Sequence, residues 1–267
     1  MTLSQYAKDQ TPLPYGHGLW VARGLEPNHS VVHKFGHNQS VSSSYTPVCV
    51  DGVYRTPQVT SATSLRVKAG NANDTAAGTG AREVTVSGLS PTGELISEAI
   101  ATAGTSASAP TTLTFIRLFR VEITASGTYA SAVAGSHSAD IVIEDSAGTE
   151  DWATIPVVNF PHGRSQIGVY TIPLGYTGYI RDYEVESEGN KPCDFLLFSR
   201  EGVLDIAAPY SAMEVRAELV GVDGNIQDVF EYPLGPFPAL TDVGWMVKGA
   251  STPEASVDFT IVLVADE

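Results

Sequence analysis

Charged side chains, cysteine and long apolar runs are all scarce in this 267-residue chain. Asp, Glu, Lys and Arg make up 17% of it, against about 25% in typical soluble proteins. This composition excludes an acidic disordered chain, a coiled coil, a collagen and a disulfide scaffold. No apolar run reaches the roughly 18 residues that a transmembrane helix needs, so we expect no contact with a membrane.

The cysteines, Cys49 and Cys193, stand far apart in the sequence. The N-terminal residues carry no secretory signal pattern, which favours synthesis in a reducing compartment. We therefore predict two separate free thiols.

The net charge of −15 results from 30 acidic and 15 basic side chains. So acidic a body is not expected to bind nucleic acid. The charge is uneven, because residues 1–70 hold six basic and three acidic side chains, whereas residues 155–267 hold six basic and 17 acidic ones. This asymmetry favours an N-terminal region that faces a partner and a body that faces solvent. The alternative is that the charges are scattered unevenly by chance.

The patterning predicts an all-β protein with three parts. Residues 1–45 contain several Pro and Gly and no sustained period, which is typical of an extended docking arm. Residues 46–148 are expected to form an antiparallel β-sandwich domain, and residues 155–267 a second, jelly-roll-like one. The polar segment 145–151 is the predicted linker. The expected strands include 65–68, 83–87, 113–123, 140–144, 167–172, 179–187, 194–199, 213–220, 227–232, 243–248 and 257–264.

The expected partner contacts lie in the arm. Its apolar anchors and charged partners are Trp20, Arg23, Val31, Val32, Lys34 and Phe35.

Three other patterns have both a functional and an ordinary interpretation. His29, His33 and His37 recur every four residues, which suits a metal only on a helix, and Pro27 and Gly36 argue against one. Gly78-Thr79-Gly80 lacks the Lys and the following helix of a phosphate loop, so we expect a turn. An acidic stripe predicted on one strand face is either solvated, cation-binding or a partner contact: Asp182, Glu184, Glu186 and Glu188.

No nucleophile elbow, zinc-protease motif or Cys-His pair occurs, so we expect no enzyme activity and no cofactor. A carbohydrate platform would need exposed aromatic side chains, and those in strands are more often core. The candidates for such a platform are Tyr170, Tyr176, Tyr179, Tyr210, Phe237 and Trp245.

Several segments together resemble a recurrent arrangement in virion proteins of tailed bacteriophages. They span most of the chain from about residue 30 to 180: 32–38, 48–54, 73–82, 84–89, 115–117 and 165–179. The resemblance implies a non-enzymatic structural component of the virion, assembled in the host cytoplasm.

A head decoration (cement) protein is the first hypothesis within this class. It would dock on the major capsid protein or another virion protein and form a homo-oligomer, with a trimer favoured. The alternatives are a fibre or tail adhesin that binds a host-surface glycan, and a neck or tail-adaptor component.

Overall fold

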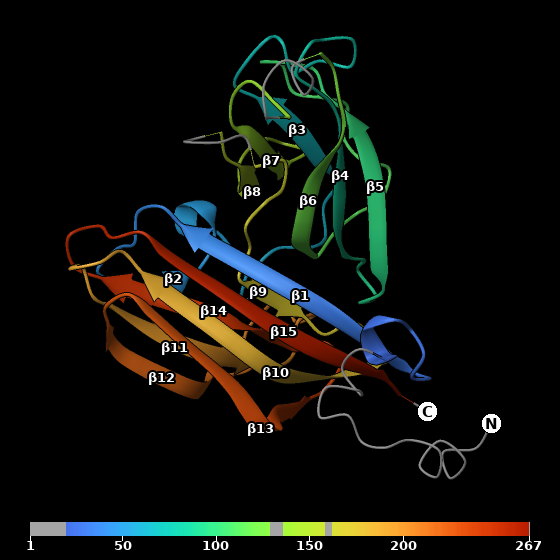
Figure 1. Cartoon of the computed structure of the whole chain (residues 1–267). Helices are drawn as coiled ribbons and strands as arrows, with labels where there is room; N and C mark the ends of the chain where they lie inside the picture. The colour runs from blue at the N-terminus through green and yellow to red at the C-terminus, as the bar shows by residue number, and fades with distance from the viewer. Residues whose placement is uncertain (1–19, 129–135, 158–161, 267) are drawn as a thin grey trace.

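The computed structural model describes residues 20–128, 136–157 and 162–266, and these residues are almost entirely β (Figure 1). All hydrogen-bonded strand pairs between the named strands are antiparallel. The all-β antiparallel sandwich expected from the sequence is therefore confirmed. Within the described residues, no helix is both long and apolar enough to span a membrane.

The larger part of the molecule, called here the sandwich, consists of two facing sheets. One sheet has the order β1-β15-β10-β13 and the other the order β12-β11-β14-β2, with β9 also paired to β14. These strands are β1 (His29–Asn38), β2 (Thr46–Pro47), β9 (Val169–Thr171), β10 (Tyr176–Ser187), β11 (Cys193–Arg200), β12 (Glu214–Val222), β13 (Asn225–Phe237), β14 (Asp242–Gly249) and β15 (Ala255–Ala265).

The smaller part, called here the inserted lobe, lies between β2 and β9 in the chain and stands on the β1 side of the sandwich (Figure 1). It pairs its strands in two sheets of order β3-β7-β8 and β5-β4-β6. These strands are β3 (Leu65–Ala69), β4 (Ala81–Leu89), β5 (Leu95–Ala101), β6 (Arg117–Ser126), β7 (Ile141–Asp145) and β8 (Asp151–Ile155).

The expected division into an arm and two successive domains is wrong. Residues 29–38 of the expected arm form β1, which pairs along its full length with β15. β2 pairs with β14, so the sandwich contains residues from both sides of the inserted lobe. Residues 1–19 lie outside the described part of the chain. The hydrogen bonds to β15 stabilise residues 29–38 as a strand, and a local sequence pattern does not reveal a partner so distant in the chain.

The predicted linker 145–151 is a hairpin turn between β7 and β8. The Asp145 carboxylate accepts hydrogen bonds from the backbone N–H groups of Ala147, Thr149 and Glu150, and Gly148 adopts a φ of 71°. The polar composition therefore indicates a tight turn closed by an aspartate, not a domain boundary.

The run 113–123 shows why apolar residues occupy both faces of a strand. Phe115, Ile116, Leu118 and Phe119 are all buried, and the register between β4 and β6 shifts at Gly88. A bulge and cover on both sides, which the sequence pattern predicts, both occur here.

The alternating residues of the last strand also face inward as expected. Val257, Phe259 and Ile261 of β15 pack against Trp245 of β14 within one core cluster. A second cluster fills the inserted lobe and continues into Phe198 and Met246 of the sandwich. The two parts therefore share buried surface at their junction. Both cysteines are buried free thiols, as predicted.

Gly36 allows β1 to approach the segments that leave and re-enter the sandwich. A Cβ at this position would collide with the carbonyl oxygen of Val48 and the backbone of Gly168. We predict that Gly36→Ala lowers the free energy of unfolding by about 1–3 kcal/mol, because backbone atoms on both sides cannot yield. Urea unfolding measures the change. Gly189→Ala is the control, since nothing lies within 4 Å of a Cβ there. Equal stability of the two variants would contradict the prediction.

Candidate functional site: a basic cleft between the two parts

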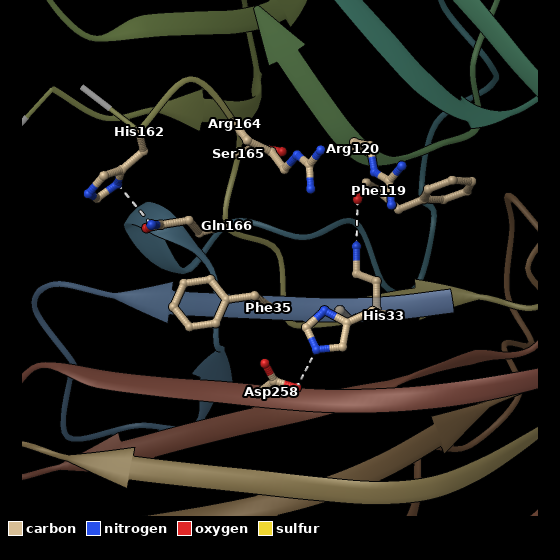
Figure 2. A pocket seen from close by; sticks show the side chains of 10 residues that line it. His33, Phe35, Phe119, Arg120, His162, Arg164, Ser165, Gln166 and Asp258 are labelled. Atoms are coloured by element: carbon tan, nitrogen blue, oxygen red, sulfur yellow. Dashed lines mark hydrogen bonds and ion pairs between the residues drawn. The ribbon is translucent and has the colours of Figure 1, made fainter. Parts of the chain in front are cut away.

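A cleft of about 430 Å³ opens where β1 of the sandwich faces the inserted lobe (Figure 2). β1 forms one wall of the cleft, the first residues of β6 form another, and the segment that leads from the lobe back to β9 forms the third. The charged and imidazole side chains that line it are His33, Lys34, Arg120, His162, Arg164 and Asp258. Positive charge therefore gathers in one recess of an otherwise strongly acidic protein.

Lys34 spans the junction at the base of this cleft. Its side chain is 6% exposed, and its Nζ donates a hydrogen bond of 2.6 Å to the carbonyl oxygen of Phe119 in β6. The ammonium nitrogen also lies 6.0 Å from the ring centroids of both Phe119 and Tyr170. Burial, opposed by Cys49 and assisted by the nearby Arg120 and Arg164, lowers the pKa of Lys34 to about 7.

The two arginines of the lobe differ in their partners. The Arg164 guanidinium donates to a carboxylate oxygen of Glu122 over 3.0 Å. The Arg120 side chain lines the cleft and forms no hydrogen bond or ion pair with any other described residue. An arginine with its five donors unused in a recess is uncommon, because its fork geometry matches carboxylates so well.

The opposite wall carries a polar pair and an aromatic ring from β1. His33 Nε2 lies 2.8 Å from a carboxylate oxygen of Asp258 in β15. The ring of Phe35 is 44% exposed at the same wall (Figure 2). Between the walls, the Nε2 of Gln166 lies 2.8 Å from Nδ1 of His162, and its buried Oε1 has no hydrogen-bond partner among the described residues.

The structure divides the predicted docking residues into two groups. Val31 and Phe35 project outward from β1 and are exposed, and Arg23 is exposed just before the strand. Lys34 is buried, Val32 packs against the core, and Trp20 is half-buried in a short helical turn at 20–22. Val31, Phe35 and the exposed Leu25 are called here the docking face.

A second exposed apolar surface lies on the far side of the sandwich, at β12 and β13, and is called here the open edge (Figure 1). Each of these two strands ends its sheet. The large apolar side chains exposed here are Val215, Val220, Ile226, Val229 and Tyr232. The alternation of 213–220 predicts an inward-facing Val215, but its side chain is 58% exposed.

The three histidines and the acidic stripe provide no metal centre among the described residues. On β1 the histidines are spaced by about 13 Å, which is too far apart to share one ion. Asp182 and Glu184 lie on β10 and contact Arg181 and Asn225 respectively. Glu188 follows the strand and pairs with Lys191.

Three of the six aromatic side chains considered for a carbohydrate platform lie in the core, which is the interpretation that the sequence favours. Tyr170, Phe237 and Trp245 are buried in the core. A bulge of β10 between Ile180 and Asp182 changes the face on which the residues before it lie, so Tyr179 is only half-buried. The segment at Gly78 and Gly80 is a turn, as predicted.

The sequence alone does not reveal the cleft, because its residues come from separate segments. Arg120, His162 and Arg164 carry no local pattern that relates them to Lys34. Lys34, which points inward from β1, is the one signal in the sequence that indicates a polar contact at this junction.

These features define a two-part antiparallel β protein with a basic cleft at its junction. Neither a protein-family model nor a curated protein matches the sequence. Among solved structures, the infectious bursal disease virus VP2 subviral particle aligns with a TM-score of 0.23 and 10% identity, over 89% of this chain and 72% of that chain. The structure of the Gx strain of that virus aligns with a TM-score of 0.20 and 9% identity, over 89% and 75%. No function is transferred from similarities at this level.

Proposed function

We propose that the chain is a non-enzymatic structural component of a tailed-bacteriophage virion, namely a capsid decoration (cement) protein. The observation that carries the proposal is the presence of two separate exposed apolar surfaces, the docking face and the open edge. The strands that carry them, β1 on one side and β12 and β13 on the other, lie on opposite sides of the sandwich (Figure 1). A protein that joins two neighbours needs two such surfaces, and exposed apolar patches mark protein contacts.

The two surfaces have different partners in this proposal. The docking face contacts the major capsid protein, with Val31 and Phe35 as apolar anchors and Arg23 as a charged contact. The open edge contacts a further copy of the chain, in a trimer. Binding to the assembled shell but not to free capsid subunits stabilises the shell by mass action. Each contact needs roughly 1,200–2,000 Å² of total buried surface to be specific and stable.

The strand order of the sandwich supports a virion role. Numbered along the chain, its eight main strands form sheets of order 1-8-3-6 and 5-4-7-2. We interpret this arrangement as a jelly roll with a lobe inserted between its second and third strands. Jelly rolls occur in viral capsid proteins and in lectins, so the topology supports the proposal without selecting one function.

A capsid-binding assay tests the docking face. We predict that Val31→Asp combined with Phe35→Asp weakens binding to shells that lack this protein by at least about tenfold, because each carboxylate must lose its water on docking. Val59→Asp is the matched control, since Val59 is 56% exposed on the inserted lobe, outside both surfaces. Equal affinity of the double variant and the control would contradict the proposal. Copy number is a second readout: hundreds of copies per virion support decoration, whereas about a dozen indicate a neck ring.

A further inference from the structure

The basic cleft has the composition of a binding site rather than of a structural junction. A structural junction pairs its charges, yet Arg120 is left without a partner beside Arg164 and Lys34. Like charges held together repel each other, and an anion in the cleft relieves that repulsion. The volume of about 430 Å³ is in the range of small-molecule pockets. Such a recess with a few convergent polar groups is where a ligand is expected.

The electrostatics of the surroundings limit the ligand to a single negative charge. Asp258 lines the cleft and Glu122 pairs with Arg164, and both carboxylates repel a second negative charge. The net charge of −15 also opposes the approach of a polyanion. The planar fork of Arg120 suits a carboxylate, which it can bind through two parallel hydrogen bonds.

The rest of the lining suits a ring that carries hydroxyl groups. The exposed ring of Phe35 offers a flat apolar surface on one wall (Figure 2). The partly exposed His33 imidazole and Asp258 carboxylate also line the cleft, and both can form hydrogen bonds with ligand hydroxyl groups. We propose that the cleft binds an acidic saccharide of one or two rings, whose carboxylate is held by Arg120 and whose ring packs against Phe35.

Binding is coupled to a proton in this arrangement. A bound carboxylate raises the pKa of Lys34 from its value of about 7, so the complex takes up protons. The titratable and charged groups that face Lys34 are Cys49, Arg120, Arg164 and Tyr170, and those elsewhere in the cleft are His33, His162 and Asp258. Affinity therefore falls as the pH rises. Lys34→Met is expected to weaken this pH dependence.

Calorimetric titration of the full chain with methyl β-glucuronide tests the proposal. We expect binding of the glucuronide and at least about tenfold weaker binding of methyl β-glucoside, which has the same ring without the charge. Arg120→Gln is expected to lower the affinity for the glucuronide about tenfold or more, with Arg120→Lys in between. Arg181→Gln is the control, because Arg181 lies exposed on β10 and pairs with Asp182.

The thermal unfolding midpoint of Arg120→Gln should be no lower than that of the native chain, because the guanidinium side chain has no described partner to lose and its removal relieves repulsion with Lys34 and Arg164. Phe35→Ala gives a second, independent test of the ring contact. Equal binding of glucuronide and glucoside would overturn the proposal, as would full affinity in Arg120→Gln. Tighter binding of inorganic phosphate than of the glucuronide would also overturn it, and would assign the cleft to phosphate. Both proposals use Phe35, but Arg120 lies outside the docking face and Val31 lies outside the cleft lining. Arg120→Gln and Val31→Asp therefore test the two proposals separately, and either proposal can fail alone.

Discussion

Arg117→Met is expected to lower the free energy of unfolding by about 3–5 kcal/mol, the range for breaking a buried ion pair by removing one partner. Arg117 and Asp242 are 1% and 0% exposed, and Nη2 of the arginine lies 2.8 Å from a carboxylate oxygen of the aspartate. Nε of the arginine donates to the same carboxylate. The variant leaves the Asp242 charge buried with the Thr171 hydroxyl as its remaining close donor.

Urea unfolding at neutral pH measures this loss, with Lys191→Met as the control. Lys191 pairs with Glu188 at the surface, where both side chains are more than a third exposed, so its loss should change stability by less than about 1 kcal/mol. The double variant Arg117→Met, Asp242→Leu should recover much of the loss, because no charge is then left buried. A double variant less stable than Arg117→Met would show that packing, and not the orphaned charge, dominates.

This pair also explains why the cleft keeps its shape. Arg117 starts β6 of the inserted lobe and Asp242 starts β14 of the sandwich, so the ion pair joins the two parts. Gln58 accepts a hydrogen bond from the same guanidinium, and the Tyr54 and Thr171 hydroxyls pair beside it. Arg120 lies three positions after Arg117 in the same strand. The walls of the cleft are therefore positioned by a buried polar network.

Most strands could be predicted from the sequence because their alternation reflects a half-buried face. All seven strands expected between 167 and 264 occur, as β9 to β15. The strand β1 was missed because its inward positions include Lys34, Gly36 and Asn38, while Val31 and Phe35 face outward. That pattern is the reverse of an ordinary amphipathic strand. Its partner, β15, lies more than 200 residues away, and no local signal encodes such a pairing.

The candidate site could be predicted only in part, for a related reason. Lys34 and Phe35 stand out in the sequence as a basic and an aromatic residue in a region of few strand signals, and the structure places both at the cleft. Arg120 and Arg164 belong to other segments and become neighbours only when the inserted lobe folds back on β1. The alternation of 213–220 predicts an inward-facing Val215, which is exposed, because alternation alone does not distinguish an edge strand from a central one.

The stability of the native chain is expected to rise between about pH 7 and pH 8.5, and Lys34→Met should abolish this rise. Burial lowers the pKa of Lys34 from the ordinary 10.5 to about 7. Between these two values the unfolded chain binds one proton more than the folded chain, so stability increases with pH by up to about 1.4 kcal/mol per unit. Below pH 7 both states are protonated and the full penalty of the buried charge remains.

Two histidines and the buried thiols change the stability mainly outside the range from pH 7 to pH 8.5. Burial lowers the pKa of His137 and His162, so their contributions are complete by about pH 7. Burial raises the pKa of Cys49 to about 12 and that of Cys193 to about 11, so these thiols destabilise the fold only at higher pH. Urea unfolding at several pH values should give the native chain roughly 1–2 kcal/mol more gain across the window than Lys34→Met. Parallel pH profiles for the two proteins would mean that Lys34 is not held in a desolvated site, because only a lysine with a lowered folded-state pKa produces the difference.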